Sequence, residues 1–240
     1  SSMQKARNAM VKLRSIWITL SVSLHCLTML YSGRLTRQKV DSSLRRWSSK
    51  LFHYIKASFS VNNADVLKEL KGKPVIFMSN HASLYDIPLT FNALPGSIRM
   101  LTKKELFSVP IWGRAMLRSE FIPIDRKNFK KAIDDLNYAK EKLLSGIQLW
   151  VYPEGTRSLD GRLGKFKKGG FHLALDTDAL IVPVALQGTY DIMPPKSKAI
   201  ALNRHMQITV GEPIETSSYS KDTLPNLMQT VHQRIEQLMQ

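Results

Sequence analysis

Cysteine and acidic side chains are both scarce in this chain. A single cysteine, Cys26, excludes an internal disulfide and fits a reducing compartment. Only 19 Asp and Glu stand against 35 Lys and Arg, which leaves a formal net charge of +16. Such an excess indicates an anionic partner, either a phospholipid surface, a nucleic acid or an acidic protein. The length of 240 residues suits one α/β domain with an appendage and a core that needs no disulfide to fold.

Charged residues are missing altogether between Ser15 and Gly33. Apolar residues recur there at helical spacing, which predicts a helix over about residues 16–31. A spanning helix needs about 20 mostly apolar residues, so this one is short, and no small-residue cleavage site follows it as in a signal peptide. We therefore expect it to lie in one leaflet of a membrane. The residues expected to contact lipid are Trp17, Leu20, Leu24 and Leu27.

A second amphipathic helix is expected over about residues 42–59, with Asp41 as its N-terminal cap. Trp47 lies on its apolar face and is a further expected membrane contact, while most of its cations fall elsewhere, as in a helix at a bilayer interface. Residues 1–60 carry 11 Lys and Arg against one Asp, and each cation near an anionic surface contributes about 1 kcal/mol. The alternative is that both apolar faces pack on the rest of the chain or on each other.

The remainder of the chain alternates short apolar runs with amphipathic stretches. This alternation predicts an α/β domain with a mixed, largely parallel sheet flanked by helices. Residues 1–60 are thus expected to form a basic two-helix membrane anchor, and residues 61–240 the α/β domain. The expected strands are 75–79, 98–102, 121–124, 148–152, 180–186 and 206–210. The expected helices are 84–93, 110–117, 128–145, 169–176 and 223–239.

His81 and Asp86 directly follow the first of these strands, 75–79. A neutral imidazole can accept a proton near pH 7, and a carboxylate on its other nitrogen fixes the tautomer and stabilises the cation that forms. On a straight helix, positions five apart point about 140° away from each other. The two side chains can therefore meet only if His81 lies in the turn before a helix and Asp86 in its first turns. The alternative is a simple capping turn, with Asn80 or Ser83 as the cap.

Cations follow three other expected strands, at Lys103-Lys104, Arg126 and Arg157, and a further basic segment contains Lys165, Lys167 and Lys168. Parallel strands place their carboxyl ends at one edge of the sheet, where ligands bind. Arginine suits bidentate phosphate binding and lysine supplies a flexible point charge. The sequence thus predicts a proton acceptor beside an anion-binding site.

Four segments occur in a distinctive order: N-H-x4-D at 80–86, F-I-x-x-x-R at 121–126, P-E-G-T-R-S at 153–158 and V-P-V-x-x-x-G at 182–188. They resemble the four blocks of the glycerolipid acyltransferases, specifically the bacterial 1-acyl-sn-glycerol-3-phosphate acyltransferases. The first and third blocks together are highly specific, whereas the second and fourth are weak signals individually. The resemblance covers about residues 70–215. In one departure, this chain reads Arg118-Ser119-Glu120 where the second block commonly carries a glycine shortly before its phenylalanine.

The resemblance implies transfer of a fatty acyl group from acyl carrier protein or coenzyme A to the sn-2 hydroxyl of lysophosphatidate. His81 would act as the general base and Asp86 would orient it, with no covalent acyl-enzyme and with neither a metal nor a cofactor. The implied ligands of the phosphate are Arg126, Arg157 and, more weakly, Lys104. The residues implied to position the substrate are Glu154, Gly155 and Thr156. The implied location is the cytoplasmic face of a bacterial inner membrane, with monotopic attachment through the N-terminal helices.

Several other functions fit the sequence less well. Ser83 as a nucleophile lacks a G-x-S-x-G elbow around it, and a metal hydrolase would need a third histidine or a carboxylate cluster near His81. Nucleic acid fits poorly as a partner, because the cations alternate with Leu, Trp and Phe and no recognition motif is present. A non-catalytic membrane-binding protein would need no His81, and a lyso-ornithine lipid would be an acceptor without a phosphate. The sequence gives no indication of an oligomeric state.

Overall fold

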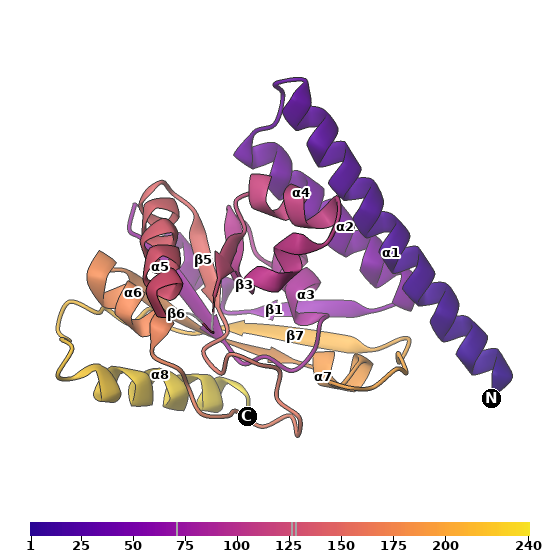
Figure 1. Ribbon diagram of the computed structural model, residues 1–240. Helices are drawn as coiled ribbons and strands as arrows, with labels where there is room; N and C mark the ends of the chain where they lie inside the picture. The colour runs from indigo at the N-terminus through magenta and orange to yellow at the C-terminus, as the bar shows by residue number, and fades with distance from the viewer. Residues whose placement is uncertain (71, 126, 128) are drawn as a thin grey trace.

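The computed structural model describes residues 1–70, 72–125, 127 and 129–240, in which a seven-stranded sheet carries helices on both faces (Figure 1). The strands, in their order across the sheet, are β1 (Ser58–Asn62), β7 (His205–Val210), β6 (Leu180–Gln187), β2 (Val75–Ser79), β5 (Gln148–Val151), β3 (Ile98–Lys103) and β4 (Ile122–Ile124). All neighbours pair parallel except β6 and β7, which are antiparallel. The predicted mixed, largely parallel sheet is confirmed.

The helices form one layer on each face of this sheet. The α-helices are α1 (Ser2–Tyr31), α2 (Arg37–Ile55), α3 (Asp86–Ala93), α4 (Trp112–Arg118), α5 (Phe129–Leu144), α6 (Gly169–Thr177), α7 (Thr189–Ile192) and α8 (Leu224–Leu238). Two 3-10 helices, η1 (Ala64–Leu70) and η2 (Lys104–Ser108), precede β2 and follow β3. Side chains alternate between the faces along each strand, so Phe77 packs with α2 and α3 and Ile76 with α5 and α8. All six predicted strands begin within one residue of their expected positions, and 75–79 matches at both ends.

The N-terminal region differs most from expectation. Helix α1 begins at Ser2 rather than near residue 16 and runs along one side of the molecule, with its N-terminal end projecting beyond the sheet (Figure 1). Helix α2 ends at Ile55, because Lys56 adopts a left-handed conformation with φ 53°. The residues after it form β1, which pairs parallel with β7, where a continuing helix was expected. That expectation was wrong since the pairing partner lies about 150 residues further along the chain.

Asp41 is not the cap of α2, contrary to the sequence-based prediction. The hydroxyl of Thr36 takes that role and accepts a hydrogen bond from the Lys39 backbone N–H at 3.2 Å. Asp41 lies inside the helix instead and pairs with the buried Arg99 of β3, Oδ1 to Nη1, at 2.7 Å. Its other oxygen accepts a hydrogen bond from Ser97 at 2.6 Å. Asp41 therefore pairs with a buried arginine of the sheet instead of capping the helix.

A second ion-pair network joins α2 to the segment before β4. Glu120 accepts two hydrogen bonds from the Arg37 guanidinium, at 2.7 and 2.8 Å, and one from Lys142 of α5 at 3.1 Å. Its φ is 72°, a left-handed conformation that glycine adopts most easily. Glu120 thus combines a backbone conformation that favours glycine with an ion pair that glycine could not form.

The Arg37–Glu120 pair predicts a specific dependence of stability on pH. Hydrogen bonds from Arg37 are the largest influence and lower the pKa of Glu120 from 4.5 to about 2. Because the folded pKa lies below the unfolded one, the stabilisation is complete above pH 4.5 and disappears as the pH falls towards 2. We expect Glu120→Gln to lower the free energy of unfolding near pH 7 by about 2 kcal/mol. Thermal unfolding in detergent at several pH values measures this, and parent and variant curves that stay equally far apart from pH 6 to 3 would contradict it.

Candidate active site

His81 and Asp86 meet at the carboxyl end of β2. The His81 Nδ1 atom lies 2.8 Å from Asp86 Oδ2, with His81 in the loop after the strand and Asp86 at the first position of α3. This is the geometry that the five-residue spacing required. Asp86 is completely buried, while the His81 side chain is 13% exposed and lines a cavity. The pair therefore presents its free imidazole nitrogen, Nε2, on the side away from the carboxylate.

Four groups fix the Asp86 carboxylate. Besides His81, Oδ2 accepts the backbone N–H groups of Ala82, at 2.7 Å, and Ser83, at 2.9 Å. The Thr189 hydroxyl donates a hydrogen bond to Oδ1. Thr189 follows Gly188, whose φ is 95° and where a Cβ atom would lie 2.6 Å from the His205 carbonyl oxygen. The close turn after β6 thus needs glycine and brings Thr189 to the carboxylate.

Asn80 ties the His81 loop to the neighbouring strand. Its side-chain amide donates to the Leu186 carbonyl at 2.8 Å, and its side-chain oxygen accepts the Leu186 backbone N–H at 2.7 Å. The Ser83 hydroxyl is completely buried and accepts the Tyr85 backbone N–H at 3.2 Å. Both side chains thus satisfy backbone groups, so these two neighbours of His81 are held in a single conformation.

Tyr152, the last residue before the third block, packs against one face of the His81 imidazole. Its ring stacks on the His81 ring with centroids 3.9 Å apart and an interplanar angle of 19°. Within the part of the chain that the structure describes, its buried hydroxyl has no hydrogen-bond partner. Burial, helped by the Asp86 charge, raises the pKa of this phenol well above its usual value. This contact is not predictable from the sequence, because nothing local indicates which side chain packs against His81.

Removing the Tyr152 hydroxyl should stabilise the protein. A buried hydroxyl without a partner costs about 1–3 kcal/mol of desolvation, whereas a phenylalanine ring would keep the stacking on His81. We expect Tyr152→Phe to raise the free energy of unfolding by about 1 kcal/mol. Denaturant unfolding of the detergent-purified chain measures the difference. A loss of stability instead would show that the hydroxyl is satisfied in solution.

Glu154 connects the first and third blocks. Its Oε1 atom accepts the His81 backbone N–H at 3.0 Å, and its Oε2 atom accepts the Gly164 N–H at 2.9 Å. Burial raises the pKa of this carboxyl, and the two backbone hydrogen bonds oppose the shift. Gly155 has φ 81°, and a Cβ atom there would lie 2.9 Å from Lys167 Cε. The third block therefore holds the His81 loop and lets Lys167 cross closely over the glycine.

A cavity of about 780 Å³ opens beside His81 at this edge of the sheet. Its cationic lining residues are Lys103, Lys127, Arg157, Lys167 and Lys196. Its apolar lining residues include Leu84, Ile87, Met100, Leu106, Ile124 and Leu136. Among the described lining residues Asp125 is the one carboxylate. The cavity thus combines a general base with a positively charged part and an apolar part, as an anionic amphiphile requires.

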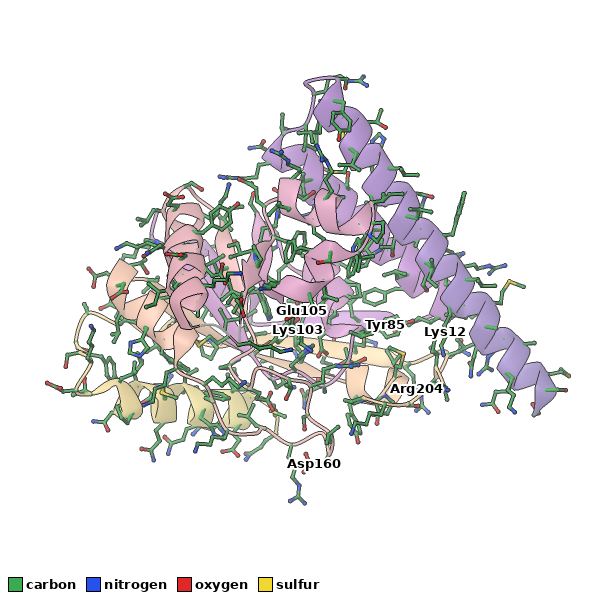
Figure 2. All side chains as sticks on the ribbon, viewed as in Figure 1. Lys12, Tyr85, Lys103, Glu105, Asp160 and Arg204 are labelled. Atoms are coloured by element: carbon green, nitrogen blue, oxygen red, sulfur yellow. The ribbon has the colours of Figure 1, made fainter. Side chains whose placement is uncertain are left out.

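The structure brings together some of the predicted anion ligands. Arg157, Gly155 and Thr156 line the cavity, while Arg126 lies outside the described residues. Lys104 does not stand among the lining residues of the described chain, and its ammonium group pairs with Asp125 at 2.8 Å. Its neighbour Lys103 lines the cavity instead, and Figure 2 shows it beside Glu105 near the middle of the molecule.

The expected membrane contacts fall into two groups. On α1, Trp17 and Leu24 are exposed and Leu20 and Leu27 are half-buried, so this stripe faces outwards. A window of α1 is long and apolar enough to cross a membrane by length and composition, and 28% of it is buried within the molecule. Trp47 lies between the two helices instead, where its indole N–H donates to the Thr19 hydroxyl at 2.9 Å. One face of α1 is thus free for lipid, while Trp47 packs within the molecule.

Comparison with known proteins agrees with these motifs. The Acyltransferase family model matches residues 58–187. A chloroplastic 1-acyl-sn-glycerol-3-phosphate acyltransferase of Arabidopsis thaliana is 38% identical over 144 residues, which is 60% of this chain and 40% of that protein. The Saccharomyces cerevisiae 1-acyl-sn-glycerol-3-phosphate acyltransferase is 34% identical over 189 residues, which is 77% of this chain and 62% of that protein.

The fold is shared with a solved structure as well. The crystal structure of the 1-acyl-sn-glycerophosphate acyltransferase PlsC from Thermotoga maritima matches with a TM-score of 0.79 and 24% sequence identity, over 98% of this chain and 97% of that one. The chain spans about two fifths of the length of the chloroplastic relatives that it matches. Because the family model covers more than half of the chain, this protein belongs to the acyltransferase family.

Proposed function

We propose that this protein transfers a fatty acyl group from a thioester of acyl carrier protein or coenzyme A to the sn-2 hydroxyl of 1-acyl-glycerol-3-phosphate, giving phosphatidate. The observation that carries the proposal is the cavity in which the His81–Asp86 pair, cationic side chains and an apolar wall meet. The similar proteins in Arabidopsis and yeast that are named for this activity support the choice of substrate.

The reaction follows from the geometry of His81. Its Nε2 atom removes the proton of the acceptor hydroxyl while Asp86, fixed by backbone N–H groups, stabilises the imidazolium that forms. The acceptor oxygen attacks the thioester carbonyl, and the tetrahedral intermediate then expels the thiolate, which takes the proton from His81. No covalent acyl-enzyme is needed.

The oxyanion of the tetrahedral intermediate needs hydrogen-bond donors. The backbone N–H of His81 is bound to Glu154, and those of Ala82 and Ser83 are bound to Asp86. The first block is therefore a poor source, and we place the donors in the third block or its surroundings, including the cations of the cavity.

Arg157 is the described arginine that we assign to the substrate phosphate, together with Arg126 and the lining lysines. Glu154 acts by holding the His81 loop, and Gly155 and Thr156 shape the wall of the cavity beside Arg157. Lys103 replaces Lys104 in our assignment, because Lys104 already pairs with Asp125. Attachment to one leaflet of the bacterial cytoplasmic membrane through α1, with residues 61–240 on the cytoplasmic side, completes the proposal.

Neutralising Arg157 tests the substrate assignment. A charged hydrogen bond to phosphate contributes about 1.5–3 kcal/mol, so Arg157→Ala should raise the KM for lysophosphatidate by about 10- to 100-fold. With 1-monoacylglycerol, which lacks the phosphate, the variant and the parent should behave alike. Arg162→Ala, an exposed arginine that does not line the cavity, is the matched control. An unchanged KM for lysophosphatidate in Arg157→Ala would reject the phosphate assignment, and faster transfer to lyso-ornithine lipid would favour that acceptor.

A further inference from the structure

Three apolar side chains of η2 and of the segment that joins it to α4 are exposed to solvent: Leu106, Val109 and Ile111, called here the apolar ridge. Their exposed fractions are 36%, 40% and 39%. Isolated exposed apolar residues are ordinary, but three within six positions of the chain form an apolar patch of the kind that marks a binding surface. The ridge is separate from α1 and α2 in sequence, so it is not a part of the N-terminal anchor.

The backbone of the ridge holds Ile111 in a costly conformation. Ile111 has φ 67° and ψ −61°, and the Trp112 backbone N–H donates to the Pro110 carbonyl at 2.7 Å. This is a tight three-residue turn with positive φ at its centre, a rare and strained arrangement, above all for a β-branched residue. With 39% of its surface exposed, Ile111 gains only part of the stabilisation that full burial within the chain would give. Contact with an apolar environment outside the protein would bury the side chain further and so offset part of the cost of the strained backbone.

The ridge is continuous with the exposed face of α1. Arg114, three residues beyond Ile111, places its guanidinium 5.5 Å from the ring centroid of Tyr31 at the end of α1. Ser119 at the end of α4 contacts Cys26 of α1, Oγ to Sγ, at 3.2 Å. Five exposed apolar residues of α1 recur every seven positions, namely Met3, Met10, Trp17, Leu24 and Tyr31, and Leu13 and Ile16 are exposed on the same helix. Helix α4 thus connects the ridge directly to the apolar stripe of the N-terminal helix.

The ridge also borders the mouth of the cavity. Leu106 lines the cavity and is exposed, and so is Leu84, which lies three residues after His81. Tyr85, the next residue, is buried in the same apolar cluster as Val11 of α1, and Figure 2 shows it beside that helix. The cavity opening, α1 and the ridge are therefore neighbours on the molecule.

We propose that the apolar ridge is a second membrane-inserted element, which enters the acyl-chain region of the bilayer beside α1 and sets the cavity mouth against the lipid. The flanking cations favour a lipid surface over other apolar partners, because Lys103, Arg114 and Arg118 are exposed and can reach phosphate groups. Lipid substrates then enter the cavity sideways from the leaflet without crossing water. This inference does not depend on the reaction that His81 performs.

Fluorescent labelling of the full-length chain tests insertion without measuring turnover. An NBD label is attached to Ile111→Cys, and the matched control is Ile133→Cys, an isoleucine on α5 that is 46% exposed against 39% for Ile111. The native Cys26 is buried, and a Cys26→Ser background removes any labelling there. In phosphatidylethanolamine–phosphatidylglycerol vesicles, brominated acyl chains should quench the label at 111 at least twofold and leave the label at 133 unchanged. Equal quenching at both positions, or none at 111, would overturn the proposal.

Charge substitution gives a second and independent readout. Transfer of an apolar side chain from water to an apolar phase is favourable, whereas transfer of a carboxylate is strongly unfavourable. The double variant Val109→Asp/Ile111→Asp should therefore partition into the same vesicles at least tenfold more weakly, and Ile133→Asp should partition like the parent. Because neither 109 nor 111 lines the cavity, activity on a short-chain, water-soluble acceptor should persist. Unaltered partitioning of the double variant, or shielding of 111 that appears only as the protein concentration rises and so reveals a second copy of the chain, would count against insertion.

Discussion

His81→Ala is expected to lower the rate of acyl transfer to lysophosphatidate by about 10³-fold or more, with little change in the KM of either substrate. General acid–base catalysis contributes about 10²–10⁴-fold, and His81 is assigned both the removal of the hydroxyl proton and its delivery to the thiolate. Substrate binding should persist, because the cations and the apolar wall of the cavity are untouched. Initial rates with a radiolabelled acyl donor in detergent measure the effect.

Ser83→Ala is the matched control for that experiment. Ser83 lies two residues from His81 and is the alternative nucleophile, but its hydroxyl is buried and accepts the Tyr85 backbone N–H. We expect its loss to change the rate only a few-fold. A Ser83→Ala variant that is as inactive as His81→Ala, while remaining folded, would point to a covalent serine mechanism.

Asp86→Asn should combine a large loss of activity with a loss of stability. Each Asp86 oxygen accepts hydrogen bonds, Oδ2 from His81, Ala82 and Ser83 and Oδ1 from Thr189. An asparagine amide has only one acceptor oxygen. Its NH₂ group would replace the other carboxylate oxygen and face the hydrogen-bond donors that bind that oxygen now. We expect a rate of acyl transfer at least about 10²-fold below that of the parent, and a free energy of unfolding reduced by about 2–4 kcal/mol.

Asp160→Asn controls for the loss of one negative charge. Asp160 is exposed, and the hydrogen bonds that it accepts from the Arg162 backbone N–H and the Ser158 hydroxyl lower its pKa. It does not line the cavity among the described residues, so the rate should stay within about twofold of the parent. If Asp86→Asn retained the parent's activity, the role of Asp86 in orienting His81 would be wrong, whatever its effect on stability.

The central strands β2, β5 and β6 are predictable from sequence because they are buried on both faces. Parallel strands covered by helices read as continuous apolar runs, and 75–79 is the clearest example. The His81–Asp86 contact was also predictable, since the strand–turn–helix order leaves one way for residues five apart to meet. Local sequence is sufficient in both cases.

Contacts between distant segments were not predictable in this way. Asp41 looks like a helix cap until Arg99, which lies 58 residues later, is placed against it. Tyr152 and Thr189 reach the His81–Asp86 pair from the ends of two other strands, and their identities carry no local signal. The choice between Lys103 and Lys104 depends on which of two consecutive side chains faces the cavity where β3 ends.

The most direct test of the account is product analysis with the parent chain and His81→Ala side by side. The detergent-purified proteins are incubated with labelled acyl carrier protein or coenzyme A thioesters and 1-acyl-glycerol-3-phosphate, and the product is identified by mass spectrometry. The account predicts phosphatidate labelled at the sn-2 position from the parent and essentially none from His81→Ala. Equal amounts of labelled phosphatidate from both proteins, or none from the parent with either donor, would contradict it.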